Sequence, residues 1–143
     1  MIVVDANILL YAHDRSSSRQ PAASDWLGAT LNGPEDVGLG LVTVLAFIRI
    51  ATDPRIFDQP LSSAEAISIV EEWLNRPNVS LLHPTDRHWR TLAEQAEHGQ
   101  ARGAMLMDAH LATLVRERGA VLATADRDFT RFKGLRTIDP TAG

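Results

Sequence analysis

The chain begins with the sequence MIVVDANILLY (residues 1–11), in which a short apolar, β-branched run leads directly into an aspartate and an asparagine. Such a run is typical of a strand buried on both faces of a parallel sheet. A carboxylate at the end of a buried strand is costly unless a cation or hydrogen-bond donors meet it, and ligands bind at this edge of open parallel sheets. Asp5 therefore has two interpretations: a functional carboxylate, or simply the N-cap of the helix that follows.

The same arrangement returns near the other end of the chain, in the sequence AVLATADRDF (residues 120–129). A second buried strand over residues 120–124 is followed by Asp126 and Asp128. If the two strands are parallel neighbours, Asp126 lies at the same edge of the sheet as Asp5. The alternative is that Asp126 and Asp128 form an Asx turn in a solvated loop.

A third carboxylate, Asp108, lies in the first turn of a helix predicted over Met107–Arg118. This helix leads into the strand at residues 120–124, and a right-handed crossover returns its N-terminus to the carboxyl end of that strand. Taken alone, Asp108 is explained by capping or by a favourable contact with the helix dipole. Taken together, the three positions predict that Asp5, Asp108 and Asp126 converge.

Converging carboxylates destabilise one another's ionised form, and a divalent cation relieves that conflict. Oxygen ligands without His or Cys favour Mg²⁺ or Mn²⁺. Such an ion polarises a phosphoryl oxygen and activates water, which is the chemistry of phosphodiester hydrolysis. Asp128 is a candidate further ligand, and Asn7 and Thr124 are neutral oxygen donors suited to orienting the carboxylates or water.

The rest of the chain alternates predicted helices and strands, which indicates a parallel sheet with helices on both faces. One of the serines in residues 16–18 is expected to cap a second helix, Thr43 to cap a buried helix, and Ser62–Glu65 to form a capping box. A helix over Asp86–His98 is expected to turn Trp89 inward, as the later helix turns Met107 inward. The expected strands are residues 2–4, 37–41, 79–82, 120–124 and 135–138.

Composition limits the class of protein. The 143 residues suit one domain, 1–143, and no apolar run approaches the length of a membrane span. There is no cysteine and no signal-peptide pattern, so we expect a cytoplasmic protein without disulfides. The net charge of −4 argues against binding nucleic acid through bulk charge, but ions held by the acidic residues would invert the local field.

These motifs resemble the PIN domain, and specifically the VapC-type ribonuclease toxins of toxin–antitoxin pairs. The matching stretches are residues 2–7, 45–57, 107–112 and 122–129. The resemblance implies a three-layer α/β/α fold with a central five-stranded parallel sheet. It also implies Mg²⁺- or Mn²⁺-dependent RNA cleavage, a homodimer, and a small VapB-type antitoxin that occludes the site.

Carried over residue by residue, the resemblance makes Asp5, Asp108 and Asp126 the metal-binding aspartates and Asn7 and Thr124 the polar support. One position departs from the family pattern, because the helix that usually carries a Glu has Ala46 in that place. The number of bound metal ions is therefore open, with Asp128 as a possible compensating ligand.

Two alternatives to the nuclease remain. A weakened PIN scaffold that binds RNA or a partner without cutting would account for Ala46. An aspartyl-phosphate phosphatase normally has a second acid where this chain has Asn7, and a lysine before the distal acidic loop, whereas Lys133 follows it. Arg127 and Arg131 are candidate contacts to an RNA backbone or part of a solvated face. His110 is assigned to packing, and the three tryptophans are assigned to the core or to a dimer interface.

Overall fold

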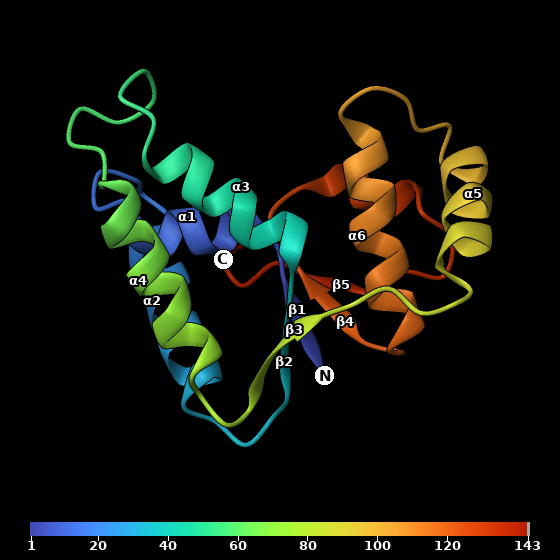
Figure 1. Cartoon of the computed structure of the whole chain (residues 1–143), viewed down its shortest axis with the longest axis horizontal. Helices are drawn as coiled ribbons and strands as arrows, with labels where there is room; N and C mark the ends of the chain where they lie inside the picture. Colours follow the sequence, from blue (N-terminus) through green and yellow to red (C-terminus); the bar gives the residue numbers. More distant parts are fainter. Residues whose placement is uncertain (143) are drawn as a thin grey trace.

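A computed structural model describes residues 1–142 and has a five-stranded, wholly parallel sheet at its centre (Figure 1). The strand order is β3-β2-β1-β4-β5, so β1 lies in the middle with β4 beside it. The predicted fold class is confirmed. The strands are β1 (Ile2–Val4), β2 (Val37–Gly40), β3 (Val79–Leu82), β4 (Val121–Ala123) and β5 (Thr137–Ile138).

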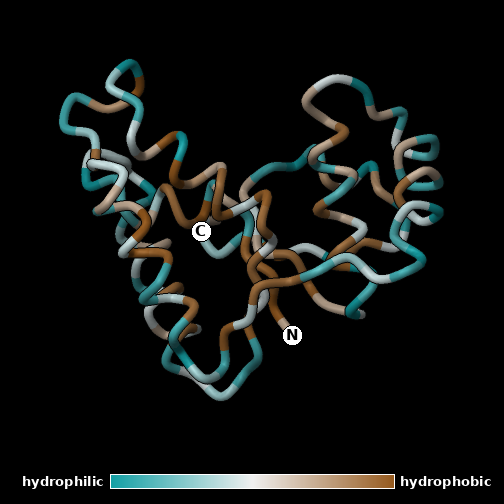
Figure 2. The backbone as a smooth tube through the Cα atoms, in the orientation of Figure 1, coloured by the Kyte–Doolittle hydropathy of each residue, from teal (hydrophilic) through white to brown (hydrophobic). Residues whose placement is uncertain are grey.

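Helices cover both faces of this sheet. One face carries α1 (Ala6–His13), α2 (Gln20–Leu31), α3 (Leu41–Ala51) and α4 (Ser63–Leu74), and the other carries α5 (His88–His98) and α6 (Met105–Glu117) (Figure 1). Side chains alternate across a strand, so Val4 packs into the first core and Val3 into the second. Figure 2 shows the resulting pattern, with apolar residues concentrated along the sheet and polar residues on the outside of α5.

The pairing of β1 with β4 brings the two acidic ends of these strands to one edge. Val4 pairs with Ala123, and the backbone N–H of Asp5 donates to the carbonyl of Ala123 at 2.9 Å. Beyond β4 the chain turns into a short 3₁₀ helix, η1 (Arg127–Arg131). The sequence motifs after β1 and β4 are therefore neighbours in space.

Several local predictions were wrong at helix ends. The N-cap of α3 is Gly40 rather than Thr43, because the chain passes directly from β2 into the helix and buries Thr43 in the first turn. Arg19 rather than a serine is the N-cap of α2, since the Ser17 hydroxyl accepts from the Arg19 N–H in the preceding turn. The capping box of α4, from Ser62 and Glu65, is confirmed.

Two predicted inward-facing side chains point outward. Trp89 is 80% exposed, because Thr85 and His88 both bond to α6 and so fix the rotation of α5 with His88, not Trp89, against its neighbour. Met107 is 53% exposed, since α6 packs on the sheet through another face, which includes Leu111, Leu114 and Val115. The other two tryptophans, Trp26 and Trp73, do pack against the first core.

The predicted helix and strand bounds also shift. The two helices predicted over 86–98 and 107–118 occupy His88–His98 and Met105–Glu117, and the last strand is shorter than the predicted residues 135–138. Among residues 1–142, no helix is both long and apolar enough to cross a membrane.

Candidate metal-binding site at the carboxyl ends of β1 and β4

Asp5 follows β1 directly and is the N-cap of α1, so the capping interpretation of this residue is confirmed. Its Oδ1 accepts from the N–H of Ala6 at 2.7 Å. Its Oδ2 accepts from the Thr124 hydroxyl at 2.8 Å and from the Asn7 amide at 3.1 Å. The capping bond thus fixes one oxygen, and two polar side chains at the edge of the sheet fix the other.

Thr124 and Asn7 join the loops that follow β1 and β4. The Asn7 amide donates to the Thr124 hydroxyl at 3.2 Å, while the Asn7 carbonyl oxygen accepts from the N–H of Ala125 at 3.2 Å. The Thr124 hydroxyl also accepts from the N–H of Asp126 at 3.0 Å. These bonds hold two segments that are more than a hundred residues apart in one rigid polar cluster.

Asp126 begins an Asx turn, as the alternative interpretation predicted. Its Oδ1 accepts from the N–H of Asp128 at 2.9 Å and opens η1, leaving the second oxygen of the half-buried carboxylate available. Asp128 itself is exposed. The turn therefore accounts for the local structure of this loop, and it occupies only one oxygen of the Asp126 carboxylate.

Asp108 shares an electrostatic environment with the other three carboxylates. Burial, followed by repulsion from Asp5, Asp126 and Asp128, raises the pKa of Asp108 to about 6. Burial also raises the pKa of Asp5, and Asp126 adds to this effect, although the hydrogen bonds from Thr124 and Ala6 oppose it. Mutual repulsion of this kind is what a bound cation relieves.

The donor set suits a hard divalent cation, although the carboxylates are not closed around one point. Within residues 1–142, no three His, Cys, Asp or Glu side chains are grouped closely enough to enclose a metal ion as they stand. Asp5, Asn7, Thr124 and Asp126 are directly connected by hydrogen bonds, and Asp108 and Asp128 are coupled to them through charge. Oxygen atoms from carboxylates, an amide and a hydroxyl are the ligands that Mg²⁺ and Mn²⁺ prefer.

The remaining predicted positions are Arg127, Arg131 and Ala46. Arg127 is exposed, and Arg131 bonds through its guanidinium to the carbonyl of Gly99 at 3.3 Å. Ala46 faces a groove of about 620 Å³ between α3 and α6, and none of the residues that line this groove is acidic. Thus α3 supplies no carboxylate in the groove in place of the usual Glu.

The sequence patterns did not single out His88 and Glu117. His88 is buried between α5 and α6 and bonds to both Glu117 and His110, so His110 has a polar role beyond packing. The sequence held one weak indication, a histidine at the start of a predicted helix. The next residue, Trp89, has the more apolar side chain and was therefore expected to face inward instead.

The fold and the site together indicate a class of protein. The sheet is parallel, carboxylates follow its first and fourth strands, and a third carboxylate lies on α6, the helix before the fourth strand. The family model for the PIN domain matches residues 2–135. The chain therefore belongs to the PIN domain family.

Individual curated relatives show which members of the PIN domain family the chain resembles. The chain is 39% identical over 142 residues to ribonuclease VapC37 of Mycobacterium tuberculosis (strain ATCC 25618 / H37Rv), covering 99% of each chain. It is 36% identical over 140 residues to ribonuclease VapC33 of the same organism, covering 98% of each. These full-length relationships place it among VapC-type members of the family.

Solved structures share the fold. The VapBC-1 structure from nontypeable Haemophilus influenzae matches with a TM-score of 0.71 and 22% identity, over 99% of this chain and 100% of that chain. Mycobacterium tuberculosis VapC20, described as a Sarcin-Ricin loop cleaving toxin, matches with a TM-score of 0.68 and 17% identity, over 95% and 99%.

Proposed function

We propose that this protein is a divalent-metal-dependent endoribonuclease and the toxin of a VapBC-type toxin–antitoxin pair, with residues 1–143 acting as one PIN-like unit. The observation that carries the proposal is the cluster of mutually repelling carboxylates at the shared edge of β1 and β4. Full-length similarity to proteins named VapC ribonucleases gives the reaction and its substrate class.

The proposed metal ligands are Asp5, Asp108 and Asp126, with Asp128 as a further ligand, and the proposed ion is Mg²⁺ or Mn²⁺. When bound, the ion supplies charge neutralisation at a phosphoryl oxygen and lowers the pKa of a coordinated water. Because the carboxylates do not enclose a point in the described residues, binding requires small side-chain movements toward the ion.

The chain's own polar groups prepare the site for this role. Thr124 and Asn7 hold Oδ2 of Asp5, so the first carboxylate cannot rotate away from the cluster. The Asx turn holds one oxygen of Asp126 and leaves the other available to an ion. Oxygen atoms that are already ordered lower the cost of binding an ion, and only the remaining side-chain movements toward the ion add to that cost.

RNA is the proposed substrate, with Arg127 and Arg131 contacting its backbone beside the acidic loop. Guanidinium groups bind phosphate oxygens in a bidentate manner, which positions a strand without selecting its sequence. A small VapB-type antitoxin is the proposed protein partner, since similar solved structures from Haemophilus influenzae and Salmonella typhimurium are VapBC structures. A homodimer is the proposed oligomeric state.

The direct test is RNA cleavage by purified protein with Mg²⁺ or Mn²⁺, comparing wild type with Asp5→Asn. Asp25→Asn is the matched control, because Asp25 is an exposed carboxylate on α2. We expect Asp5→Asn to lose at least about 100-fold in rate while retaining its fold, and the control to cleave normally. Full activity of Asp5→Asn would refute the proposed site.

A second candidate function is a PIN scaffold that binds RNA without cutting it, and the observation that favours it is Ala46 in the groove between α3 and α6. RNA binding by the wild type without cleavage, at saturating metal, would support this second candidate. Release of inorganic phosphate rather than RNA fragments would instead indicate the phosphatase alternative.

A further inference from the structure

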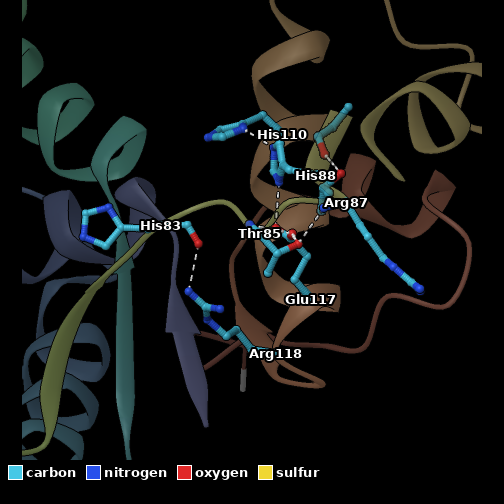
Figure 3. A network of polar contacts seen from close by, with 9 residues as sticks. His83, Thr85, Arg87, His88, His110, Glu117 and Arg118 are labelled. Carbon is cyan, nitrogen blue, oxygen red and sulfur yellow. Dashed lines mark hydrogen bonds and ion pairs between the residues drawn. The ribbon is translucent and has the colours of Figure 1, made fainter. Parts of the chain in front are cut away.

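A chain of polar contacts runs through the interface between α5 and α6 (Figure 3). His88 Nδ1 lies 2.6 Å from Glu117 Oε1, and His88 Nε2 lies 2.8 Å from His110 Nδ1. The other oxygen of Glu117 accepts from both the N–H and the hydroxyl of Thr85. The side chains of His88 and Glu117 are only 11% and 5% exposed, so these groups depend on one another for their hydrogen bonds.

The charge of Glu117 sets the direction of every hydrogen bond in this chain. Burial alone would raise the pKa of Glu117, but the hydrogen bonds from Thr85 and His88 outweigh it and hold that pKa below its usual value. An ionised Glu117 can only accept, so His88 carries a proton on Nδ1. In neutral His88 the Nε2 atom must then accept, which requires His110 to donate from Nδ1.

His88 therefore bonds to two points of α6 that are seven residues apart, which is about two helical turns or roughly 10 Å along the axis. A ring held at both ends in this way resists sliding and rotation of α6 against α5. Thr85 strengthens the attachment of His88 to Glu117, because its backbone N–H donates to the other carboxylate oxygen of Glu117. Figure 3 shows the second nitrogen of His110 pointing away from His88, so only one of the two ring nitrogens of His110 takes part in this contact.

The attachment at His110 lies two residues after Asp108 in the sequence, in the N-terminal half of α6. The N-cap residue Ala104 makes no side-chain bond to the helix, and Leu106 and Met107 in the first turn are exposed. Asp108 lies in this same first turn, so a restraint on this part of the helix also restrains its carboxylate.

We propose that Glu117, His88 and His110 form a positioning chain that holds the first turns of α6 so that Asp108 stays within reach of Asp5 and Asp126. The inference rests on the proposed metal-binding function, and it assigns these three residues a role in metal affinity and turnover without contact to metal or RNA. His110 and His88 are positioning residues, and their substitution alters the site only through α6.

The test compares wild type with His110→Ala, His110→Asn and the control His98→Ala. Asparagine places an amide N–H close to the position of imidazole Nδ1 and so retains the bond to His88, whereas alanine removes it. His98 is an exposed histidine in the last turn of α5. His110 is only partly buried, which makes its variants safer for folding than substitutions of His88.

Two readouts are needed. Imidazole ¹⁵N–¹H correlation at pH 8 is expected to show the proton of both His88 and His110 on Nδ1. Calorimetric titration with Mn²⁺, together with kcat and KM for RNA cleavage, is expected to show about tenfold weaker Mn²⁺ binding and a lower kcat for His110→Ala. KM for RNA should stay within about twofold in all variants, and His110→Asn and His98→Ala should match wild type.

Three results would overturn the positioning chain: protons on Nε2 of these rings, wild-type Mn²⁺ affinity in His110→Ala, or equal defects in His110→Ala and His110→Asn. A wild-type protein that binds Mn²⁺ but cleaves no RNA would contradict the proposed function instead. In that case the tautomers and the Mn²⁺ affinities still decide whether the chain positions Asp108.

Discussion

Replacing Asp108 with asparagine should stabilise the metal-free protein at neutral pH, although it removes a proposed metal ligand. The pKa of Asp108 is raised from 3.8 to about 6, so the folded state disfavours its ionised form. A shift of that size corresponds to at most about 3 kcal/mol. Because Asp108 is only half-buried, solvent screening reduces the expected gain to about 1 kcal/mol.

The sign of the pH dependence follows from proton binding. Between the unfolded pKa near 4 and the folded pKa near 6, the native state holds more protons than the unfolded state, so stability falls as pH rises. The free-energy advantage of Asp108→Asn should therefore be largest at pH 7.5 and shrink as pH approaches 4.5. Loss of a favourable contact with the dipole of α6 offsets a few tenths of a kcal/mol at neutral pH.

The assay is urea unfolding in EDTA at pH 4.5, 6 and 7.5, with Asp25→Asn as the control for a lost surface charge. The difference between variant and wild type cancels the titration of groups that do not interact with Asp108, while relief of repulsion at Asp5, Asp126 and Asp128 is part of the same effect. A difference that is independent of pH, or one in which the advantage of Asp108→Asn grows toward acid, would refute the assignment of repelling carboxylates to this site.

Three further predictions concern the structure around the site. Thr124→Val should destabilise the protein by about 2 kcal/mol in urea unfolding, because the partly buried carboxylate of Asp5 loses a hydroxyl donor. The buried control Thr113→Val removes a hydroxyl that only bonds a carbonyl within α6, so it should cost less than about 1 kcal/mol, and equal losses would contradict this. Gly38→Ala should cost about 1–3 kcal/mol, since its Cβ would lie 2.8 Å from Leu82 in the neighbouring strand, and an unchanged melting temperature would count against that packing. Mn²⁺ at 100 times its dissociation constant should stabilise wild type by about 2.7 kcal/mol, and should leave Asp5→Asn at its metal-free melting temperature if the site is correct.

The sheet could be predicted because its strands carry strong local signals. The buried runs at Ile2–Val4 and Val121–Ala123 have few alternatives to a central parallel strand, and the crossover rule then fixes which ends meet. The acidic residues after these strands followed from the same rule. The neighbouring positions of Asp5 and Thr124 therefore required no knowledge of tertiary packing.

Other features could not be predicted because they depend on contacts between distant elements. The rotation of α5 is set by bonds from Thr85 and His88 to Glu117, which override the apolar preference of Trp89. Local propensity places Thr43 as a cap, but the passage from β2 into α3 at Gly40 moves the start of the helix. In each case the tertiary arrangement of the chain outweighs a preference that is local to one helix.

The proposal depends most on where a divalent ion binds. Anomalous diffraction from crystals grown with Mn²⁺ is the most direct measurement, because it locates the metal without any assumption about activity. The account predicts a manganese peak between Asp5, Asp108 and Asp126 at the carboxyl ends of β1 and β4. A peak elsewhere on the molecule, or none at a Mn²⁺ concentration that supports RNA cleavage, would contradict it.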